Sequence, residues 1–467
     1  MIQRVIHSPI RPFAFSPIRP FAHSLTPMLT TAPSNSLHGT VSLPGDKSMS
    51  HRAALFAALA DGETRIANFL DAGVTRRMLG ALTALGVSWS LSENRLTVQG
   101  RGISGWSAPT APIDCGNSGT TLRLLAGAIA AAGLPAVLDG SAGLRGRPMN
   151  RIVLPLQSMG VRLASAGGCA PLTFAAGDLP LSPPEHFLLN VPSAQVKTCL
   201  LLAGLSADRP VRILEPGPSR DHSERMLRAQ GAVIRTGPAK SPDGAPVYEI
   251  VMEPPAALSP LRIKLPGDFS SAAFLIVAAL ITEGSDILIQ GVGLNPTRTG
   301  LLDALGTMGA NLAVSPVREE GGEPTGDIRV RHSRLSGTEV SGTLVVRMID
   351  EFPALAVAAA FAQGPTLVSE AGELRNKESD RIRSLCAQLS AIGVTAEERP
   401  DGFRIQGARL PTGGIVHPAG DHRIAMALAV AGLGAGGPVA VADPEIITES
   451  FPGFAAALEG LGANVDA

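Results

Sequence analysis

Residues 43–66 read LPGDKSMSHRAALFAALADGETRI, and this stretch decides the fold because five later segments repeat its pattern. Each segment has an apolar lead, a polar cluster, a helix rich in Ala and Leu, a Gly or Pro break, and a β-branched strand. The later copies begin at Ala111, Leu189, Leu265, Met348 and Pro418. A fixed internal period of this kind indicates repeated supersecondary units, so we predict six βαβ-type units.

Each unit also carries a second helix, and the two helices differ in their polarity. The second ends on Gly and restarts as a strand, as in LTALGVSW and LQSMGVRL, which suits the left-handed residue beyond a helix C-terminus. The first is apolar nearly all round, as in ALAVAAAFA, and such a helix belongs in the interior. We therefore predict an α/β fold in which buried helices are surrounded by sheet.

The composition excludes several functional classes. The 467 residues carry 39 basic and 40 acidic side chains, so no global field attracts nucleic acid or anionic lipid. The four cysteines are widely separated, without the spacing of a zinc site, so we predict no metal and a reducing, cytoplasmic location. We expect no membrane span, because the longest uncharged stretch is mostly Ala and Gly.

The amino-terminal segment differs from the rest of the chain. It has no acidic residue before Asp46, and SPIRPFAF at residues 8–15 is followed at once by SPIRPFAH. We predict that residues 1–35 form a disordered tail outside the fold. A transit peptide is the alternative, although the recurrent Pro residues do not suit an amphipathic helix.

Basic residues recur at the polar starts of the predicted helices. If buried helices point in a common direction, their positive N-terminal ends and these cations would form a cavity for a multiply charged small molecule. A single charged residue of this kind is usually a solvated surface group, but the recurrence favours a site. The residues are Lys47, Arg123, Arg147, Lys197, Arg220, Lys377, Arg381 and Arg423.

Two carboxylates accompany these cations. Asp350, in MIDEFP, precedes an apolar helix, so it is either a helix cap or a functional group. Glu378 lies one helical turn before Arg381, and a carboxylate among cations keeps its charged form and can act as a general base.

Eight segments together resemble the 5-enolpyruvylshikimate-3-phosphate synthase family. They are LPGDKSMSHR, GNSGTTLR, RPM, SAQVK, NPTRTG, MIDEFP, KESDR and DHRIAM, spread over residues 43–426. The resemblance implies an inside-out α/β barrel of two similar domains with three repeats each. We expect the first domain to span 46–265 and the second to combine 36–45 with 266–467.

The resemblance also implies a reaction without a cofactor. The carboxyvinyl group of phosphoenolpyruvate moves to the 5-hydroxyl of 3-phosphoshikimate, and phosphate is released. The expected partners are these two small molecules only, with no nucleic acid and no membrane, and we expect a monomer. The family is inhibited by glyphosate at its phosphoenolpyruvate site.

Site roles follow motif by motif from the same resemblance. The implied catalytic residues are Asp350, which takes the hydroxyl proton, and Glu378 and Lys47, either of which delivers a proton to the methylene carbon. Binding of 3-phosphoshikimate would use Lys47, Ser48, Arg52, Ser193, Ala194, Gln195, Arg220, Asp350 and Lys377. Binding of phosphoenolpyruvate would use Lys47, Gly119, Arg147, Gln195, Arg381 and Arg423.

Two alternatives and one departure remain. UDP-N-acetylglucosamine 1-carboxyvinyltransferases share the expected fold and chemistry but normally use a loop cysteine. A non-catalytic nucleotide or RNA-end binder would need aromatic stacking platforms, and the chain has one Tyr and two Trp.

Glu449 stands where many members of the resembled family have Lys, so we expect a compensating cation or a displaced loop. We also expect the cations of the two domains to repel, so that closure requires anionic ligands.

Overall fold

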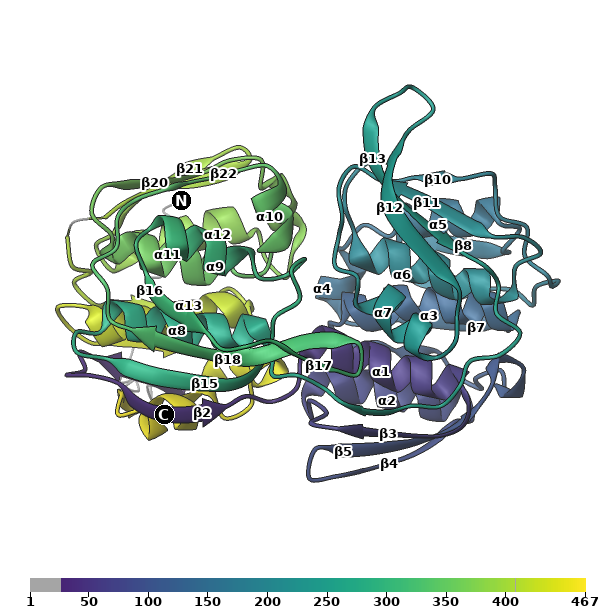
Figure 1. The fold of residues 1–467 in the computed structure, drawn as a ribbon, viewed down its shortest axis with the longest axis horizontal. Helices are drawn as coiled ribbons and strands as arrows, with labels where there is room; N and C mark the ends of the chain where they lie inside the picture. The colour runs from purple at the N-terminus through teal and green to yellow at the C-terminus, as the bar shows by residue number, and fades with distance from the viewer. Residues whose placement is uncertain (1–26, 408) are drawn as a thin grey trace, which may run out of the picture.

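The apolar first helix of each repeat lies at the centre of one of two lobes (Figure 1). The computed structural model describes residues 27–407 and 409–467. In the first lobe the central helices are α1 (Lys47–Leu59), α3 (Gly119–Ala132) and α6 (Ala194–Ala203). In the second lobe they are α8 (Phe269–Ile281), α11 (Phe352–Phe361) and α13 (His422–Gly434). Nearly all of their residues are buried, as the apolar pattern predicts.

Three four-stranded sheets surround the central helices of the first lobe, and in each the edge strand named first runs parallel to its neighbour. In order across each sheet, the strands are β14 (Arg262–Lys264), β3 (Asp61–Ala67), β5 (Arg95–Arg101) and β4 (Ser88–Ser92); β6 (Ile113–Asp114), β7 (Ala136–Asp139), β9 (Cys169–Phe174) and β8 (Leu163–Ala166); and β10 (Phe187–Leu188), β11 (Val211–Glu215), β13 (Pro246–Met252) and β12 (Ile234–Lys240). Outer helices α2 (Gly73–Ala84), α5 (Asn150–Ser158) and α7 (His222–Ala229) complete these units, with the short helix α4 (Ala142–Arg145).

The second lobe repeats this arrangement, and one of its sheets has an added strand. In order, the strands are β2 (His38–Ser42), β15 (Asp286–Gly293), β18 (Glu323–Arg331) and β16 (Asn311–Val314), with β17 (Arg318–Glu320) paired to β18; β19 (Glu339–Val340), β20 (Pro365–Val368), β22 (Gly402–Gln406) and β21 (Thr395–Arg399); and β23 (Gly414–Val416), β24 (Val439–Ala442), β1 (Met28–Ala32) and β25 (Asn464–Asp466). The remaining helices are α9 (Gly300–Thr307), α10 (Thr343–Arg347), α12 (Arg381–Ala391) and α14 (Phe454–Gly460).

The two lobes exchange strands where the chain crosses between them. Strand β2 directly precedes α1 of the first lobe but pairs with β15 of the second, whereas β14 precedes α8 of the second lobe but pairs with β3 of the first. The two crossing segments bind each other, since Asp46 N–H donates to Pro266 O and Asp268 N–H donates to Pro44 O. We call this pair of segments, residues 43–46 and 265–268, the crossing.

The division of the core follows the crossing. One apolar cluster runs from Met49 to Leu265, and the other combines Leu29, Leu37 and Leu43 with residues from Phe269 onward. That the lobes behave as separate domains stays a prediction.

The predicted boundary of the tail was wrong at its carboxyl end. Strand β1 lies within the excluded segment, pairs with β24 and β25, and buries Leu29 and Thr31. Its short alternating apolar pattern, MLTTA, was hidden by the acid-free composition that continues through it. Residues 1–26, which contain the duplication, lie outside the described residues.

The predicted helix endings are confirmed. The six glycines that close the second helices, among them Gly86 and Gly231, have φ between 82° and 98°. That left-handed region disfavours side chains with a Cβ, so these positions suit Gly.

Candidate active site

The N-terminal ends of α1, α3 and α6 face those of α11, α12 and α13 across a cavity between the lobes. Side-chain caps hold several of these starts: Asp46 accepts from Met49 N–H, Ser193 from Val196 N–H, and Asp421 from Arg423 N–H. Aligned helix N-termini attract anions, and the cations on these first turns add to that field.

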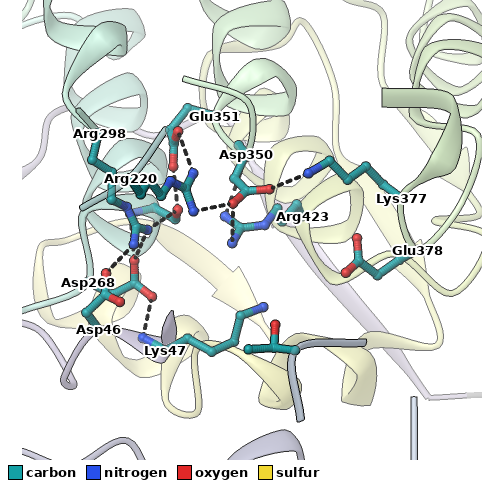
Figure 2. Close-up of polar contacts among 12 residues, drawn as sticks. Asp46, Lys47, Arg220, Asp268, Arg298, Asp350, Glu351, Lys377, Glu378 and Arg423 are labelled. Carbon is teal, nitrogen blue, oxygen red and sulfur yellow. Dashed lines mark hydrogen bonds and ion pairs between the residues drawn. The ribbon is translucent and has the colours of Figure 1, made fainter. Parts of the chain in front are cut away.

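Asp350 is surrounded by cations from both lobes (Figure 2). Its carboxylate lies 2.8 Å from Arg220 Nη1, 3.5 Å from Lys377 Nζ and 3.3 Å from Arg381 Nη1. Burial alone raises the pKa of Asp350, but Lys377, Arg220, Arg423 and Arg381 outweigh it and hold the pKa well below its usual value. The carboxylate is therefore ionised, and it makes no cap for α11.

Glu378 is the second carboxylate of the cavity. It lies 2.5 Å from Arg381 Nη2 and 3.4 Å from Arg147 Nη2, so it joins the second lobe to the first. Burial raises its pKa, but the nearby cations, led by Arg381 and Arg147, hold it well below the usual value. Glu378 is also ionised.

Lys47 differs from the two carboxylates, because its surroundings disfavour its charged form. Burial, followed by the charge of Arg423, lowers the pKa of Lys47 to about 8. Its Nζ lies 3.3 Å from His422 Nε2, and burial together with Lys47 and Arg423 lowers the pKa of His422 well below its usual value. Glu378, Asp350 and Asp268 raise the pKa of Lys47, but they do not outweigh burial and Arg423. Among the residues that the structure describes, none of these carboxylates forms an ion pair with Lys47 Nζ, so Lys47 can release its proton near pH 8.

The EPSP synthase family model, described as 3-phosphoshikimate 1-carboxyvinyltransferase, matches residues 31–458. The chain belongs to the EPSP synthase family. A 3-phosphoshikimate 1-carboxyvinyltransferase of Citrifermentans bemidjiense is 46% identical over 92% of this chain and 98% of its own length. The Geobacter metallireducens enzyme of that name is 46% identical over 93% of this chain and 99% of its own. Among solved structures, the EPSP synthase from Acinetobacter baumannii is 38% identical, covers 94% of this chain and 99% of its own, and has a TM-score of 0.81.

The comparisons confirm the family and the fold class predicted from the motifs. They do not favour the UDP-N-acetylglucosamine transferase or the nucleotide binder. Within the described ranges, no cluster of His, Cys, Asp and Glu is arranged to hold a metal ion. In the same ranges, none of the helices combines the length and hydropathy needed to cross a bilayer.

The structure brings most of the predicted EPSP synthase site residues to the wall of the cavity. They are Lys47, Ser48, Arg52, Arg147, Ser193, Ala194, Gln195, Arg220, Asp350, Lys377, Glu378 and Arg423. Gly119 lines an adjoining pocket beside Arg147. Arg381 is 1% exposed and lies behind the wall, where Nε contacts Asp421 at 2.7 Å.

Lys197 does not belong to this set. The sequence placed it among the cations of the cavity, but its side chain is 1% exposed and paired with Glu215 and Glu224. A lysine at the start of a buried helix gives the same local pattern whether it faces a cavity or an interior carboxylate.

The structure also adds residues that the motifs left without a role. Arg123 Nη1 donates to Gln195 Oε1 at 2.6 Å, and both line the cavity. Arg151, four positions after Arg147 and in the first turn of α5, reaches Glu373 of the second lobe at 3.0 Å. The spacing between Arg147 and Arg151 was the available signal for this second cation.

Glu449 lies beside the site, in a pocket that adjoins the main cavity, and it does not line the main cavity itself. It ends the 3-10 helix η4 (Pro444–Glu449) and lines the adjoining pocket with Lys47 and Arg147. Its Oε1 is 3.0 Å from the point where a Cβ on Gly73 would lie, at the first residue of α2. The free N–H groups of that helix start favour a carboxylate there.

Proposed function

We propose that this chain transfers the carboxyvinyl group of phosphoenolpyruvate to the 5-hydroxyl of 3-phosphoshikimate and releases phosphate. The observation that carries the proposal is Asp350, an ionised carboxylate held among cations of both lobes. The family membership supports the same substrates, because the named relatives are 3-phosphoshikimate 1-carboxyvinyltransferases.

The cations divide into two anion-binding groups in this proposal. Binding of 3-phosphoshikimate would use Lys47, Ser48, Arg52, the Ser193–Gln195 segment, Arg220, Asp350 and Lys377. Binding of phosphoenolpyruvate would use Lys47, Gly119, Arg147, Gln195 and Arg423, and the buried Arg381 would act from behind the wall through its bonds to Glu378 and Asp350. Arg147 and Arg423 lie on opposite lobes, so phosphoenolpyruvate would bind between them. Arg suits both phosphate and carboxylate because its planar fork can make two parallel hydrogen bonds.

Proton transfers would use Asp350 and Lys47. The hydroxyl oxygen bonds to C2 of phosphoenolpyruvate, its proton passes to Asp350, and the methylene carbon takes a proton. That carbon then returns a proton to Lys47, which restores the double bond as the bond between C2 and the phosphate oxygen breaks and phosphate leaves. Because Glu378 is ionised and the pKa of Lys47 is about 8, Lys47 is the better donor to the methylene carbon.

The low pKa of Asp350 fits a base that acts only in the filled site. The cations that lower it would be partly neutralised by the phosphate and carboxylate groups of the substrates. Asp350 would then regain basicity when both substrates are bound. This dependence would restrict proton removal to the ternary complex.

The test is phosphate release by the purified chain with phosphoenolpyruvate and each of two acceptors. We expect release with 3-phosphoshikimate and none with UDP-N-acetylglucosamine. Release only with the nucleotide sugar would contradict the proposal.

We further propose that the enzyme acts as a monomer in the cytoplasm, without nucleic-acid or membrane partners and without a cofactor. Light scattering of the purified protein measures its mass in solution and so tests the monomer.

A further inference from the structure

Three charged residues form a buried cluster behind the cavity wall of the first lobe. Lys197 Nζ lies 3.0 Å from Glu215 Oε1 and 2.8 Å from Glu224 Oε1, and all three side chains are at most 1% exposed. They come from α6, the end of β11 and α7. Burying charges is costly, and a buried ion pair is weak evidence for stability, so the cluster calls for another explanation.

The cluster holds the turn that presents Arg220. Glu215 Oε1 accepts from Ser219 N–H at 2.9 Å, and Glu215 Oε2 accepts from Ser219 Oγ at 2.7 Å. Lys197 Nζ donates to Ser219 O at 3.3 Å. All the polar groups of Ser219, the residue before Arg220, are thus bonded to the cluster.

Arg220 depends on this support. Its side chain is 11% exposed, and Nη1 contacts Asp350 across the cavity at 2.8 Å. Its Nε and Nη2 are buried without a hydrogen-bond partner among the residues that the structure describes. Nη2 also lies 4.0 Å from Glu351 Oε2, so the ion pairs of the guanidinium both run to the second lobe. Within the first lobe, its position therefore depends on the turn that carries it.

Arg52 is held by the same two helices. Its Nε donates to Ser223 Oγ at 2.7 Å and its Nη2 to Thr198 Oγ1 at 3.1 Å, and these residues adjoin Glu224 and Lys197 in the sequence. The negative charge of Glu224 acts on Arg52. The charges of the two glutamates are therefore balanced by Lys197 and Arg52.

We propose that Lys197 and Glu215 are positioning residues for 3-phosphoshikimate binding, acting through Ser219 on Arg220. This inference rests on the proposed function, since it assigns Arg220 to that ligand. The competing explanation is that Lys197 only neutralises buried glutamates and stabilises the first lobe.

The double variant Lys197→Met/Glu215→Leu separates the two explanations. It removes the pair of Lys197 with Glu215 but leaves Glu224 buried without its lysine, so we expect a lower melting temperature under either explanation. The two explanations differ in what they predict for substrate binding. The turn loses its bonds to Glu215, so we expect the KM for 3-phosphoshikimate to rise by about tenfold or more and the KM for phosphoenolpyruvate to change less than about threefold. Glu215→Gln keeps one acceptor oxygen for Ser219 and offers an N–H that Ser219 Oγ can accept, so its effect should be smaller.

The matched control is Ile213→Val, a buried substitution on the same strand as Glu215 that touches none of these bonds. It should lower the melting temperature without a selective change in either KM. A double variant with wild-type KM values, or with equal increases for both substrates, would overturn the proposal.

If the double variant does not fold, Ser219→Ala decides the question. It removes the bond to Glu215 Oε2 but also a hydroxyl group of the cavity wall, so it is compared with Glu215→Ala, which leaves that wall intact. A selective rise in the KM for 3-phosphoshikimate in both variants supports positioning, and a rise in Ser219→Ala alone or in neither contradicts it. A wild type that cannot use 3-phosphoshikimate would refute the proposed function itself, whereas an active wild type with unselective variants would refute only the positioning role.

Discussion

Asp350 contacts cations of both lobes, so its charge affects both ligand binding and the join between the lobes. Removing the carboxylate would leave Arg220, Lys377 and Arg381 facing one another. A bound phosphate would then supply the negative charge that the carboxylate had provided to these cations. The same residue therefore limits anion affinity in the empty site and supplies a base in the filled one.

For Asp350→Asn we expect turnover to fall by about 10²-fold or more, because Asn keeps the shape of the side chain but cannot take the proton. The Kd for 3-phosphoshikimate should stay within about tenfold of the wild type. Calorimetric titration beside steady-state rates measures both quantities. Near-normal turnover would remove Asp350 from the proton transfer.

Lys47 should set an alkaline limit on the rate. Its pKa of about 8 means that the proton-donating form is lost above that pH, so kcat/KM for phosphoenolpyruvate should fall above pH 8. Since the pKa is lower in the folded than in the unfolded chain, this group makes folding more favourable as pH rises from about 8 toward the ordinary lysine value. Rate profiles of wild type and Lys47→Arg test the first point. Arginine keeps the positive charge but does not release its proton in this range, so turnover should fall sharply and the limit near pH 8 should be absent; a limit that stays near pH 8 would assign it to another group.

Gly119 should discriminate between ligands by size. A Cβ there would lie 3.0 Å from both Arg123 Nη1 and Arg147 Nη1, so Gly119→Ala would displace the ends of two cavity cations. We expect crowding worth about 1 to 3 kcal/mol, felt more by glyphosate than by the shorter phosphoenolpyruvate. The inhibition constant for glyphosate should rise by a larger factor than the KM for phosphoenolpyruvate, and equal factors would show that the methyl group does not discriminate by length.

At the scale of elements, the hairpin of β17 and β18 reaches from the second lobe to α7 of the first (Figure 1). Glu323, at the start of β18, lies 2.7 Å from His222 Nδ1, and both side chains are 3% exposed. Asn295 bridges Glu323 and Asp221, and Arg225 donates to Gly322 O. The hairpin and Asn295 thus form hydrogen bonds with the residues that follow Arg220 in the chain.

We expect Glu323→Ala to destabilise the protein by about 1 to 3 kcal/mol, because it leaves buried polar partners on both lobes unsatisfied. The neighbouring Glu319 is exposed on the same hairpin, so Glu319→Ala should stay within about 0.5 kcal/mol of the wild type. Urea unfolding of the two variants compares them directly. Equal effects would mean that the hairpin makes no specific join between the lobes.

The elements were predictable wherever the chain repeats itself. Buried helices such as α11 and closing glycines such as Gly86 follow from local pattern alone, and so does the gathering of Lys47 and Arg423 at helix starts. The strand exchange was not visible in the repeats, because β2 and β14 each precede a helix in the same way and their partners lie far along the chain. Lys197 was misplaced for a related reason: Glu215 and Glu224, which neutralise it, follow 18 and 27 positions later, on other elements.

For the whole molecule, the expected repulsion between the lobes is only part of the balance. Three first-lobe arginines pair with second-lobe carboxylates: Arg147 with Glu378, Arg151 with Glu373, and Arg220 with Asp350. The ion pair of Arg298 with Asp46 at the crossing is a further contact between the lobes, at 2.5 Å. Closure is therefore assisted by the protein's own carboxylates, and anionic ligands would add to it.

Small-angle scattering should detect how far the ion pairs between the lobes offset the repulsion between their cations. The half-exposed pair of Arg151 and Glu373 is open to screening, so we expect the radius of gyration of the free enzyme to rise between about 0.05 and 0.5 M salt. Substrates should reverse the expansion. Arg151→Gln should expand at low salt, whereas Arg235→Gln, which breaks an exposed pair within the first lobe, should not; identical curves for the two variants would contradict this account.

The exchange of strands at the crossing also sets an order of events on the ribosome. Strand β2 is synthesised 244 positions before its partner β15 begins, from Ser42 to Asp286. At about 5 to 20 residues per second, this separation corresponds to roughly 12 to 50 s of translation. During that time the strands of the first lobe emerge and can pair, while β1 and β2 leave the exit tunnel with unpaired edges. Strands β1 and β2 are thus made long before the strands that they pair with, and they remain unpaired while the first lobe can already form.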